Sequence, residues 1–234
     1  MKHYPFSSEL AFLVLVLAAL LCGCARRAEV YTTEKTIRLS DSASTVEADY
    51  ILIYSDSYKI NALLEGYNQE IERGLNDTIA KFRKEALETK PYLPPEMKYE
   101  LYIKDSVFMA ADNFVSLRYM VYTFTGGAHG MTCFYSYNYD ISAEKRLDKK
   151  SLFKPACTAQ IDRVLEKYFR DPDGCFTEKP TVESATAINI TPESVTFTYD
   201  QYILGAYACG PVEINVPAAE LKDFMEIKDF PVGI

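Results

Sequence analysis

Apolar and polar residues follow two different periods in the first part of the chain. Residues 30–39 and 46–54 are rich in Thr, Tyr, Ile and Val, and the turn-like stretch 40–44 (SDSAS) separates them, which predicts two strands. Between residues 60 and 87, apolar side chains recur at nearly every third or fourth position, which predicts one amphipathic helix of about eight turns. Pro91, Pro94 and Pro95 end this helix, because proline lacks a backbone donor and disfavours helix in the residue before it.

Alternation with a period of two dominates the second half. Apolar and polar residues alternate over 99–103, 115–121 and 133–139, which predicts three strands, the first two joined near 111–113. A helix over about 157–169, a hairpin of 188–190 with 195–199 and a short strand at 212–216 complete the series. These elements predict an α+β protein with mostly antiparallel sheets and packed helices, in two modules.

The N-terminal segment predicts export and a lipid anchor. Residues 10–21 form an apolar run of twelve, long enough for a signal peptide and too short to span a bilayer. The stretch 21–24 (LCGC) resembles the bacterial lipoprotein cleavage box, so we expect a signal peptide at 1–23 and lipidation of Cys24; an ordinary secreted protein cleaved nearby is the alternative. The lipid would attach the protein to a membrane of the bacterial cell envelope, at its periplasmic or outer-membrane face.

The same reasoning divides the exported chain into modules. A tether at 24–29 precedes an N-terminal β-then-helix module at 30–95, and the proline-rich stretch separates it from a C-terminal module at 96–234. The net charge of −8 and the lack of a basic run argue against nucleic-acid binding, while a cationic partner would be attracted.

Four cysteines of the exported chain follow Cys24, and all lie in its second half. They are Cys133, Cys157, Cys175 and Cys209. An oxidising compartment favours up to two disulfides among them, and all three pairings remain open. No two of these cysteines have C-x-x-C spacing, so a zinc site is disfavoured, and we expect no metal and no cofactor.

The glycine-rich stretch 123–130 (TFTGGAHG) holds the one histidine of the exported chain. A serine or cysteine nucleophile would need His129 as its base, but no G-x-S-x-G motif exists, and Cys133 lies four residues away across a predicted turn. The stretch 171–174 (DPDG) stops short of a calcium loop and is typical of a helix end. We therefore predict no catalytic residue.

Two roles for this stretch remain open. In the first, Gly126, Gly127 and Gly130 allow a positive φ or a close backbone approach between two strands, and His129 fixes the connection by packing or hydrogen bonding. In the second, the amides of Gly126 and Gly127 form an anion-binding concavity beside His129. Tyr122 and Tyr135 are further ligand candidates, because aromatic rings stack on sugars or anchor interfaces, although cross-strand packing also explains tyrosines in strands.

A family resemblance enters at Thr123 to Phe153 (TFTGGAHGMTCFYSYNYDISAEKRLDKKSLF). Taken whole, this segment resembles the C-terminal extracellular module shared by the peptidoglycan deacetylase PdaC and the lysozyme-sensing anti-sigma factor RsiV. The segment from Tyr199 to Leu221 (YDQYILGAYACGPVEINVPAAEL) is similar to the second signature of that family. Residues 30–89 resemble, more loosely, the module that precedes it, so the resemblance covers about 200 residues.

The resemblance implies an envelope-facing binding module, which in the anti-sigma factor binds lysozyme. The catalytic domain of the deacetylase, with its metal-binding histidines and aspartates, has no counterpart among these residues, so deacetylation is not implied. We expect a noncatalytic, lipid-anchored envelope protein that binds a cell-wall component such as peptidoglycan, or a cell-wall hydrolase such as lysozyme. The alternative is a small hydrolase or transferase acting on cell-wall glycan through His129 and a nearby carboxylate.

Overall fold

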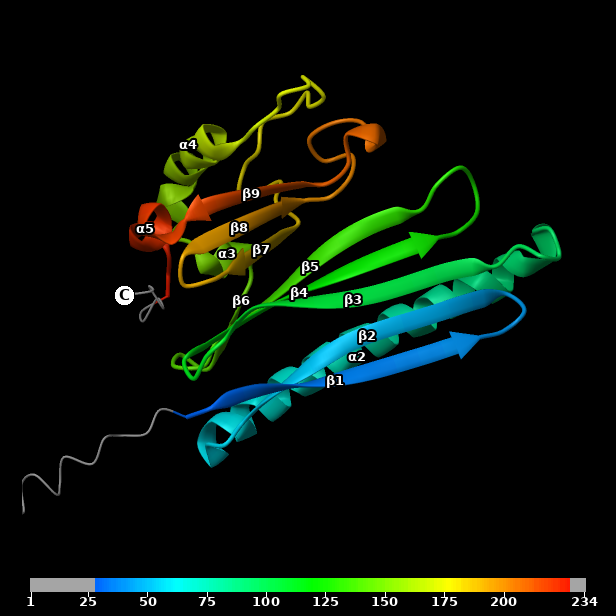
Figure 1. Ribbon diagram of the computed structural model, residues 1–234, viewed down its shortest axis with the longest axis horizontal. Helices are drawn as coiled ribbons and strands as arrows, with labels where there is room; N and C mark the ends of the chain where they lie inside the picture. Colours follow the sequence, from blue (N-terminus) through cyan, green and yellow to red (C-terminus); the bar gives the residue numbers. More distant parts are fainter. Residues whose placement is uncertain (1–27, 228–234) are drawn as a thin grey trace, which may run out of the picture.

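A computed structural model describes residues 28–227, so the predicted signal peptide and Cys24 lie outside the described residues. The chain forms a six-stranded and a three-stranded sheet, with the strands of each in sequence order (Figure 1). The strands are β1 (Val30–Ser40), β2 (Ser44–Ser55), β3 (Tyr99–Ala110), β4 (Phe114–Phe124), β5 (Met131–Asp140), β6 (Lys145–Leu147), β7 (Ala187–Ile190), β8 (Ser194–Tyr199) and β9 (Val212–Pro217). The helices are α2 (Tyr58–Thr89), α3 (Lys149–Leu152), α4 (Thr158–Tyr168) and α5 (Ala218–Leu221), with single 3-10 turns η1 (Lys90–Tyr92), η2 (Pro155–Cys157), η3 (Tyr207–Cys209) and η4 (Lys222–Phe224). The predicted α+β class is confirmed.

The first sheet contains one parallel pair among antiparallel ones. β2 and β3 run parallel and pair only over residues 44–48 and 99–103, while the neighbouring pairs are antiparallel. Parallel neighbours need a long crossover, which α2 supplies by running along one face of the sheet (Figure 1). The boundary predicted after Pro95 therefore falls between two strands of the same sheet.

Helix α2 covers the first sheet with its apolar stripe and also completes the backbone pairing of β2. Its buried apolar residues are Leu64, Tyr67, Ile71, Leu75, Ile79, Phe82 and Ala86. Beyond Ala48, β2 has no partner strand on its β3 side, and the side chain of Asn68 takes that place. The Ile53 N–H donates to Asn68 Oδ1 at 3.0 Å, and Asn68 Nδ2 donates to the Ile53 carbonyl at 2.7 Å. Buried backbone groups need such partners, which explains a polar residue within the stripe.

The second sheet has its own core and meets the first through polar contacts. β7–β9 pack with α4 and α5 in a hydrophobic cluster, into which Phe114 reaches from the first sheet. Between the sheets, Ser116 Oγ accepts a hydrogen bond from the Ile190 N–H at 3.0 Å, and Asn138 Nδ2 donates to the Ile188 carbonyl at 2.7 Å. Arg118 forms an ion pair with Glu213 at 2.6 Å. β7 is thus fixed against β4 and β5 by directional bonds.

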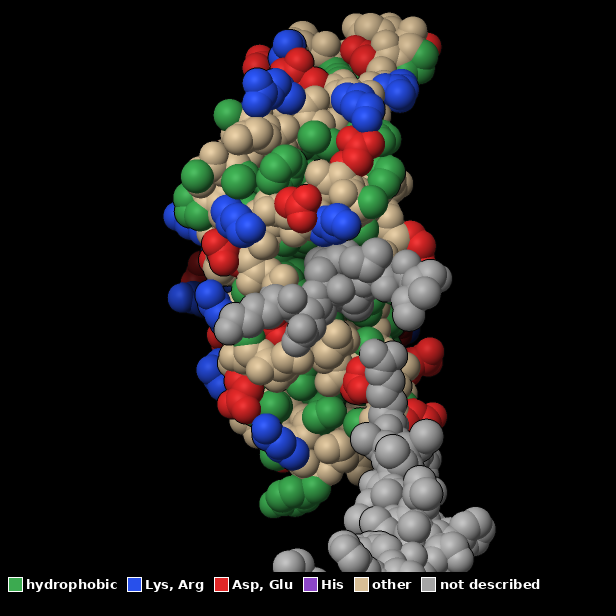
Figure 2. All heavy atoms as spheres, turned by 90° about the vertical axis from the view of Figure 1, so that its left-hand side faces the viewer, with side chains coloured by type: hydrophobic (Ala, Val, Ile, Leu, Met, Phe, Trp, Pro, Cys, Tyr) green, Lys and Arg blue, Asp and Glu red, His purple; other side chains and the backbone are tan. Residues whose placement is uncertain are grey.

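The surface mixes charges of both signs. Figure 2 shows Lys and Arg side chains interspersed with Asp and Glu on the face that it presents. No helix within residues 28–227 is both long and apolar enough to cross a membrane. Within the same residues, no group of three or more His, Cys, Asp or Glu side chains is placed to hold a metal ion.

Candidate functional site: an aromatic platform at the end of the β4–β5 hairpin

The glycines of TGGAHG connect β4 and β5, as the sequence predicts. Gly126 and Gly127 adopt φ angles of 85° and 100°, which L side chains rarely tolerate. Gly130 meets a different constraint, because a Cβ there would lie 2.4 Å from the Cζ atom of the Tyr122 ring. The loop therefore uses glycine twice for its conformation and once for a close approach.

His129 stacks on a residue that lies far away in the sequence. The rings of His129 and Tyr207 are 3.7 Å apart between centroids and 17° from parallel, and Tyr202 packs against Tyr207 at 5.6 Å. The Tyr207 hydroxyl donates to the Gly130 carbonyl at 2.9 Å. We name His129, Tyr207 and Tyr202 the aromatic platform. It joins the two segments that carry the family resemblance, and Figure 1 shows both loops at the same end of the molecule.

The platform remains open to solvent although its rings are held in place. His129 is exposed, and 55% of the Tyr202 surface is accessible. Tyr202 has a φ of 69°, a left-handed conformation that is rare for a bulky residue. Such strain persists only where surrounding structure enforces it, and it is concentrated at ligand-binding and active sites.

A disulfide fixes the loop that carries Tyr202 and Tyr207. Cys175 and Cys209 are bonded, and the N–H groups of Thr177 and Glu178 donate to the Leu204 carbonyl at 2.9 and 3.0 Å. The carboxylate of Asp171 in turn accepts hydrogen bonds from the backbone of Cys175 and Phe176, at 2.8 and 3.1 Å. The first residue of the DPDG stretch therefore holds the backbone that follows this stretch.

Side chains from this loop also cover the open edge of β5. β6 pairs with β5 only over residues 138–140. Nearer the platform, the Thr132 N–H donates to Gln201 Oε1 at 2.9 Å and the Phe134 N–H to Asp200 Oδ1 at 3.0 Å. Asp200 also accepts from the Thr186 hydroxyl at 2.8 Å, and burial raises the pKa of its carboxyl group. These two N–H groups of β5 are thereby satisfied without another strand.

The structure groups most of the predicted ligand residues but separates one. Gly126, Gly127, His129 and Tyr122 all belong to the end of the β4–β5 hairpin, where the Tyr122 ring lies against Gly130. Tyr135 lies opposite Tyr119 in the β4–β5 ladder, three positions from Tyr122 along β4. Because side chains alternate between the faces of a sheet, Tyr135 points to the face opposite Tyr122.

Two platform residues, Tyr202 and Tyr207, are absent from the sequence-based candidates. Both lie within the second resemblance segment, so that segment already contained a signal for them. Periodicity could not indicate them, because they occupy an irregular loop and a 3-10 turn.

The cysteines that do not pair offer little nucleophilic chemistry. Cys133 and Cys157 are free thiols, so one of the two disulfides that the count allows is formed and the other is not. Burial, followed by the nearby charge of Asp200, raises the pKa of the Cys133 thiol to about 11. The thiolate is the nucleophilic form, so Cys133 is poorly suited to attack at neutral pH.

Comparison with known families divides the chain in two. Residues 40–132 match the family described as deacetylase PdaC, and residues 139–219 match one described as protein of unknown function, DUF3298. The chain therefore contains a PdaC domain followed by a DUF3298 domain, which confirms the two-module resemblance seen in the sequence. The first match ends and the second begins within β5, at residues 132 and 139. They establish domains and no catalytic activity, and no curated protein matches the chain.

Solved structures share the fold. A DUF3298-family protein from Bacteroides fragilis NCTC 9343 superimposes with a TM-score of 0.57 at 19% identity, covering 86% of this chain and 94% of its own. A DUF3298-family protein from Pseudomonas aeruginosa PAO1 gives a TM-score of 0.56 at 19% identity, covering 88% and 97%. The likeness extends over both sheets and shows a common architecture.

Proposed function

We propose that this protein is a noncatalytic, lipid-anchored binding protein of the bacterial cell envelope, and that its aromatic platform recognises cell-wall glycan. The observation that carries the proposal is the stack of His129 on Tyr207, which unites the two family signatures in one exposed surface. Flat rings with accessible faces suit the apolar faces of sugar rings. The disulfide and the Gly130 carbonyl hold these rings before a ligand arrives, which reduces the entropy lost on binding.

The polar surroundings of His129 support binding more than catalysis. Its Nδ1 atom lies 3.2 Å from the Gly130 carbonyl, and no described carboxylate pairs with the ring. A general base needs a partner group to orient it and a reacting group within reach. The alternative of a glycan hydrolase or transferase using His129 therefore has less support.

A cell-wall hydrolase such as lysozyme is a second candidate ligand. The net charge of −8 favours a cationic protein partner, and exposed tyrosines are frequent anchors of protein interfaces. Attraction through net charge alone is weakened by salt, whereas a fitted interface is less sensitive to it. Salt dependence therefore separates a specific complex from unspecific attraction.

The test is calorimetric titration of the full chain in mild detergent with soluble peptidoglycan fragments and, separately, with lysozyme at two salt concentrations. Tyr202→Ala should weaken glycan binding without lowering the melting temperature by more than a few degrees, because its ring is mostly exposed. Tyr58→Ala is the matched control, since this tyrosine at the start of α2 is 91% exposed and lies outside the platform, and its loss should leave glycan binding unchanged. Glycan binding that is equal in wild type and Tyr202→Ala would refute the platform as the site, and saturable binding of lysozyme alone would favour the second candidate.

A further inference from the structure

A separate cleft lies beside β5, and Asp200 and Ile203 of the segment that leads to the platform also line it. It has a volume of about 650 Å³ and is lined by residues 134–137 of β5, by residues 183–186 and by α3 with the residues before it. Sites for small ligands are typically clefts of this size. We name it the β5 cleft.

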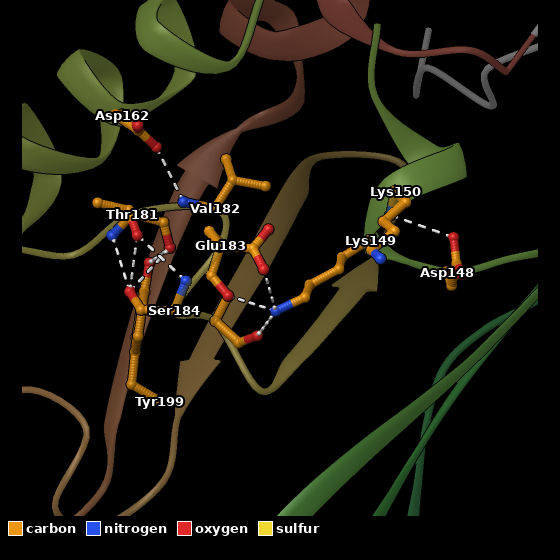
Figure 3. A network of polar contacts seen from close by, with 10 residues as sticks. Asp148, Lys149, Lys150, Asp162, Thr181, Val182, Glu183, Ser184 and Tyr199 are labelled. Carbon is orange, nitrogen blue, oxygen red and sulfur yellow. Dashed lines mark hydrogen bonds and ion pairs between the residues drawn. The ribbon is translucent and has the colours of Figure 1, made fainter. Parts of the chain in front are cut away.

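Lys149 braces one wall of the β5 cleft. Its ammonium group donates to the carbonyl oxygens of Glu183 and Ala185, the latter at 3.5 Å, and lies 3.8 Å from the Glu183 carboxylate. Figure 3 shows this side chain extended from α3 to the segment around Glu183. Because wall oxygens already partner Lys149, it is a positioning residue and its charge is largely satisfied.

Lys150 carries a positive charge that no described side chain neutralises. Residues 145–154 hold five Lys or Arg and a single acid, in a chain with a net charge of −8. That acid, Asp148, accepts hydrogen bonds from the N–H groups of Lys150 and Ser151 at 3.1 and 2.8 Å, so it serves the start of α3 (Figure 3). No described side chain pairs with the ammonium group of Lys150. This residue lines the β5 cleft and also an adjoining hollow, which Lys145 and Arg146 line as well.

Two tyrosines line the cleft, and the guanidinium group of Arg146 lies over the ring of one of them. Arg146 lies with its guanidinium carbon 4.7 Å from the centroid of the Tyr137 ring and pairs with Glu70. The neighbouring Tyr135 is 51% exposed and lines the same cleft. Asp200, the acid at the far end, is engaged by Thr186 and the β5 backbone. An accessible phenol ring therefore lines the same cleft as one free and one partly paired cation.

From this arrangement we propose that the β5 cleft binds a carboxylated sugar, with the sugar ring on Tyr135 and its carboxylate at Lys150 and Arg146. The ligand class follows from the two chemistries side by side: aromatic faces suit sugar rings, and cations bind carboxylates through strong charge-assisted bonds. This inference rests on the proposed recognition of cell-wall glycan and adds a second subsite to it. In peptidoglycan, the lactyl group of muramic acid offers such a carboxylate where no peptide is attached. Where a peptide is attached through that group as an amide, the peptide supplies the carboxylate.

The test compares three ligands by titration against the full chain in mild detergent. They are uncharged chitotetraose, a muramic-acid disaccharide without peptide, and the same disaccharide with its peptide. Lys150→Gln should weaken binding of the muramic ligand whose carboxylate the cleft holds by about tenfold, the expected loss of one charge-assisted hydrogen bond, and leave binding of chitotetraose unchanged. Tyr135→Leu should weaken the charged ligand as well. The control is Lys84→Gln, an exposed lysine on α2, which should change nothing.

Each outcome has a defined meaning. A loss only for the disaccharide without peptide assigns the cleft to the lactyl carboxylate, because the peptide, where present, is attached through that carboxyl group as an amide. A loss only for the disaccharide with peptide assigns the cleft to a peptide carboxylate, and a loss for both shows that the cleft accepts either carboxylate. Muramic ligands that bind Lys150→Gln and wild type equally, while Tyr202→Ala weakens them, would overturn the cleft and leave the platform as the glycan site. If no ligand binds the wild type, both the cleft inference and the proposed glycan recognition fail.

Discussion

Replacing Gly130 with alanine tests how the hairpin end is packed. The new Cβ would lie 2.4 to 2.5 Å from two ring carbons and the hydroxyl oxygen of Tyr122, closer than real Cβ contacts, so the ring must move. Overpacking of this kind costs about 1–3 kcal/mol. Displacing the Gly130 carbonyl would weaken its bond from the Tyr207 hydroxyl, a further loss of about 1 kcal/mol. Alanine gains back about 0.4–1 kcal/mol by restricting the unfolded chain, since Gly130 does not need a positive φ.

These contributions sum to a net destabilisation of about 2 kcal/mol, which urea denaturation would detect as a lower midpoint with an unchanged slope. Gly66→Ala is the control of opposite sign, because no atom lies within 4 Å of its Cβ and alanine is favoured over glycine in a helix by about 1 kcal/mol. In a Tyr122→Ala background, Gly130→Ala should cost much less, because the ring it strikes is gone. An equal cost in both backgrounds would refute the contact as the cause.

Three further results are expected. Serine at Cys175 or Cys209 should lower the free energy of unfolding by about 3–4 kcal/mol for a loop of sequence separation 34, and a reductant should reproduce the loss in wild type but not in the variant. The Arg83 ion pair holds the pKa of Asp41 at about 2, below its usual 3.8, so this stabilisation is present above about pH 4 and is lost as the pH falls toward 2. Asp41→Asn should therefore lower the free energy of unfolding by about 1 kcal/mol at pH 7, with the partial exposure of both side chains taken into account. The variant should also lose less stability than wild type between pH 4 and 2, and an unchanged dependence of stability on pH would contradict this. Iodoacetamide should alkylate Cys133 in the folded protein at pH 8 about a hundredfold more slowly than a free thiol, because the Cys133 pKa of about 11 leaves little thiolate. Peptide mass spectrometry would measure the rate, and alkylation as fast as that of a free thiol would contradict the raised pKa.

Local patterns in the sequence were sufficient for most of the secondary structure. The stripe of 60–87 became α2, and the alternating runs at 99–103, 115–121 and 133–139 became β3, β4 and β5 with their expected turns. Periodicity succeeds here because each element buries one face against a common core. Periodicity did not predict the short β6 and α3, because three or four residues are too few to show a period.

The sequence by itself also determined the family and the need for glycine between β4 and β5, because both depend on residues close together in the chain. Tertiary structure decided which strands, rings and cysteines lie next to one another. The parallel pairing of β2 with β3 depends on a crossover through α2, and no local pattern encodes which strand a crossover will reach. The stack of His129 on Tyr207 and the choice of Cys175 for Cys209 likewise join residues 78 and 34 positions apart. No local pattern encodes such contacts, since the energy that selects them comes from burial and directional bonding across the whole fold.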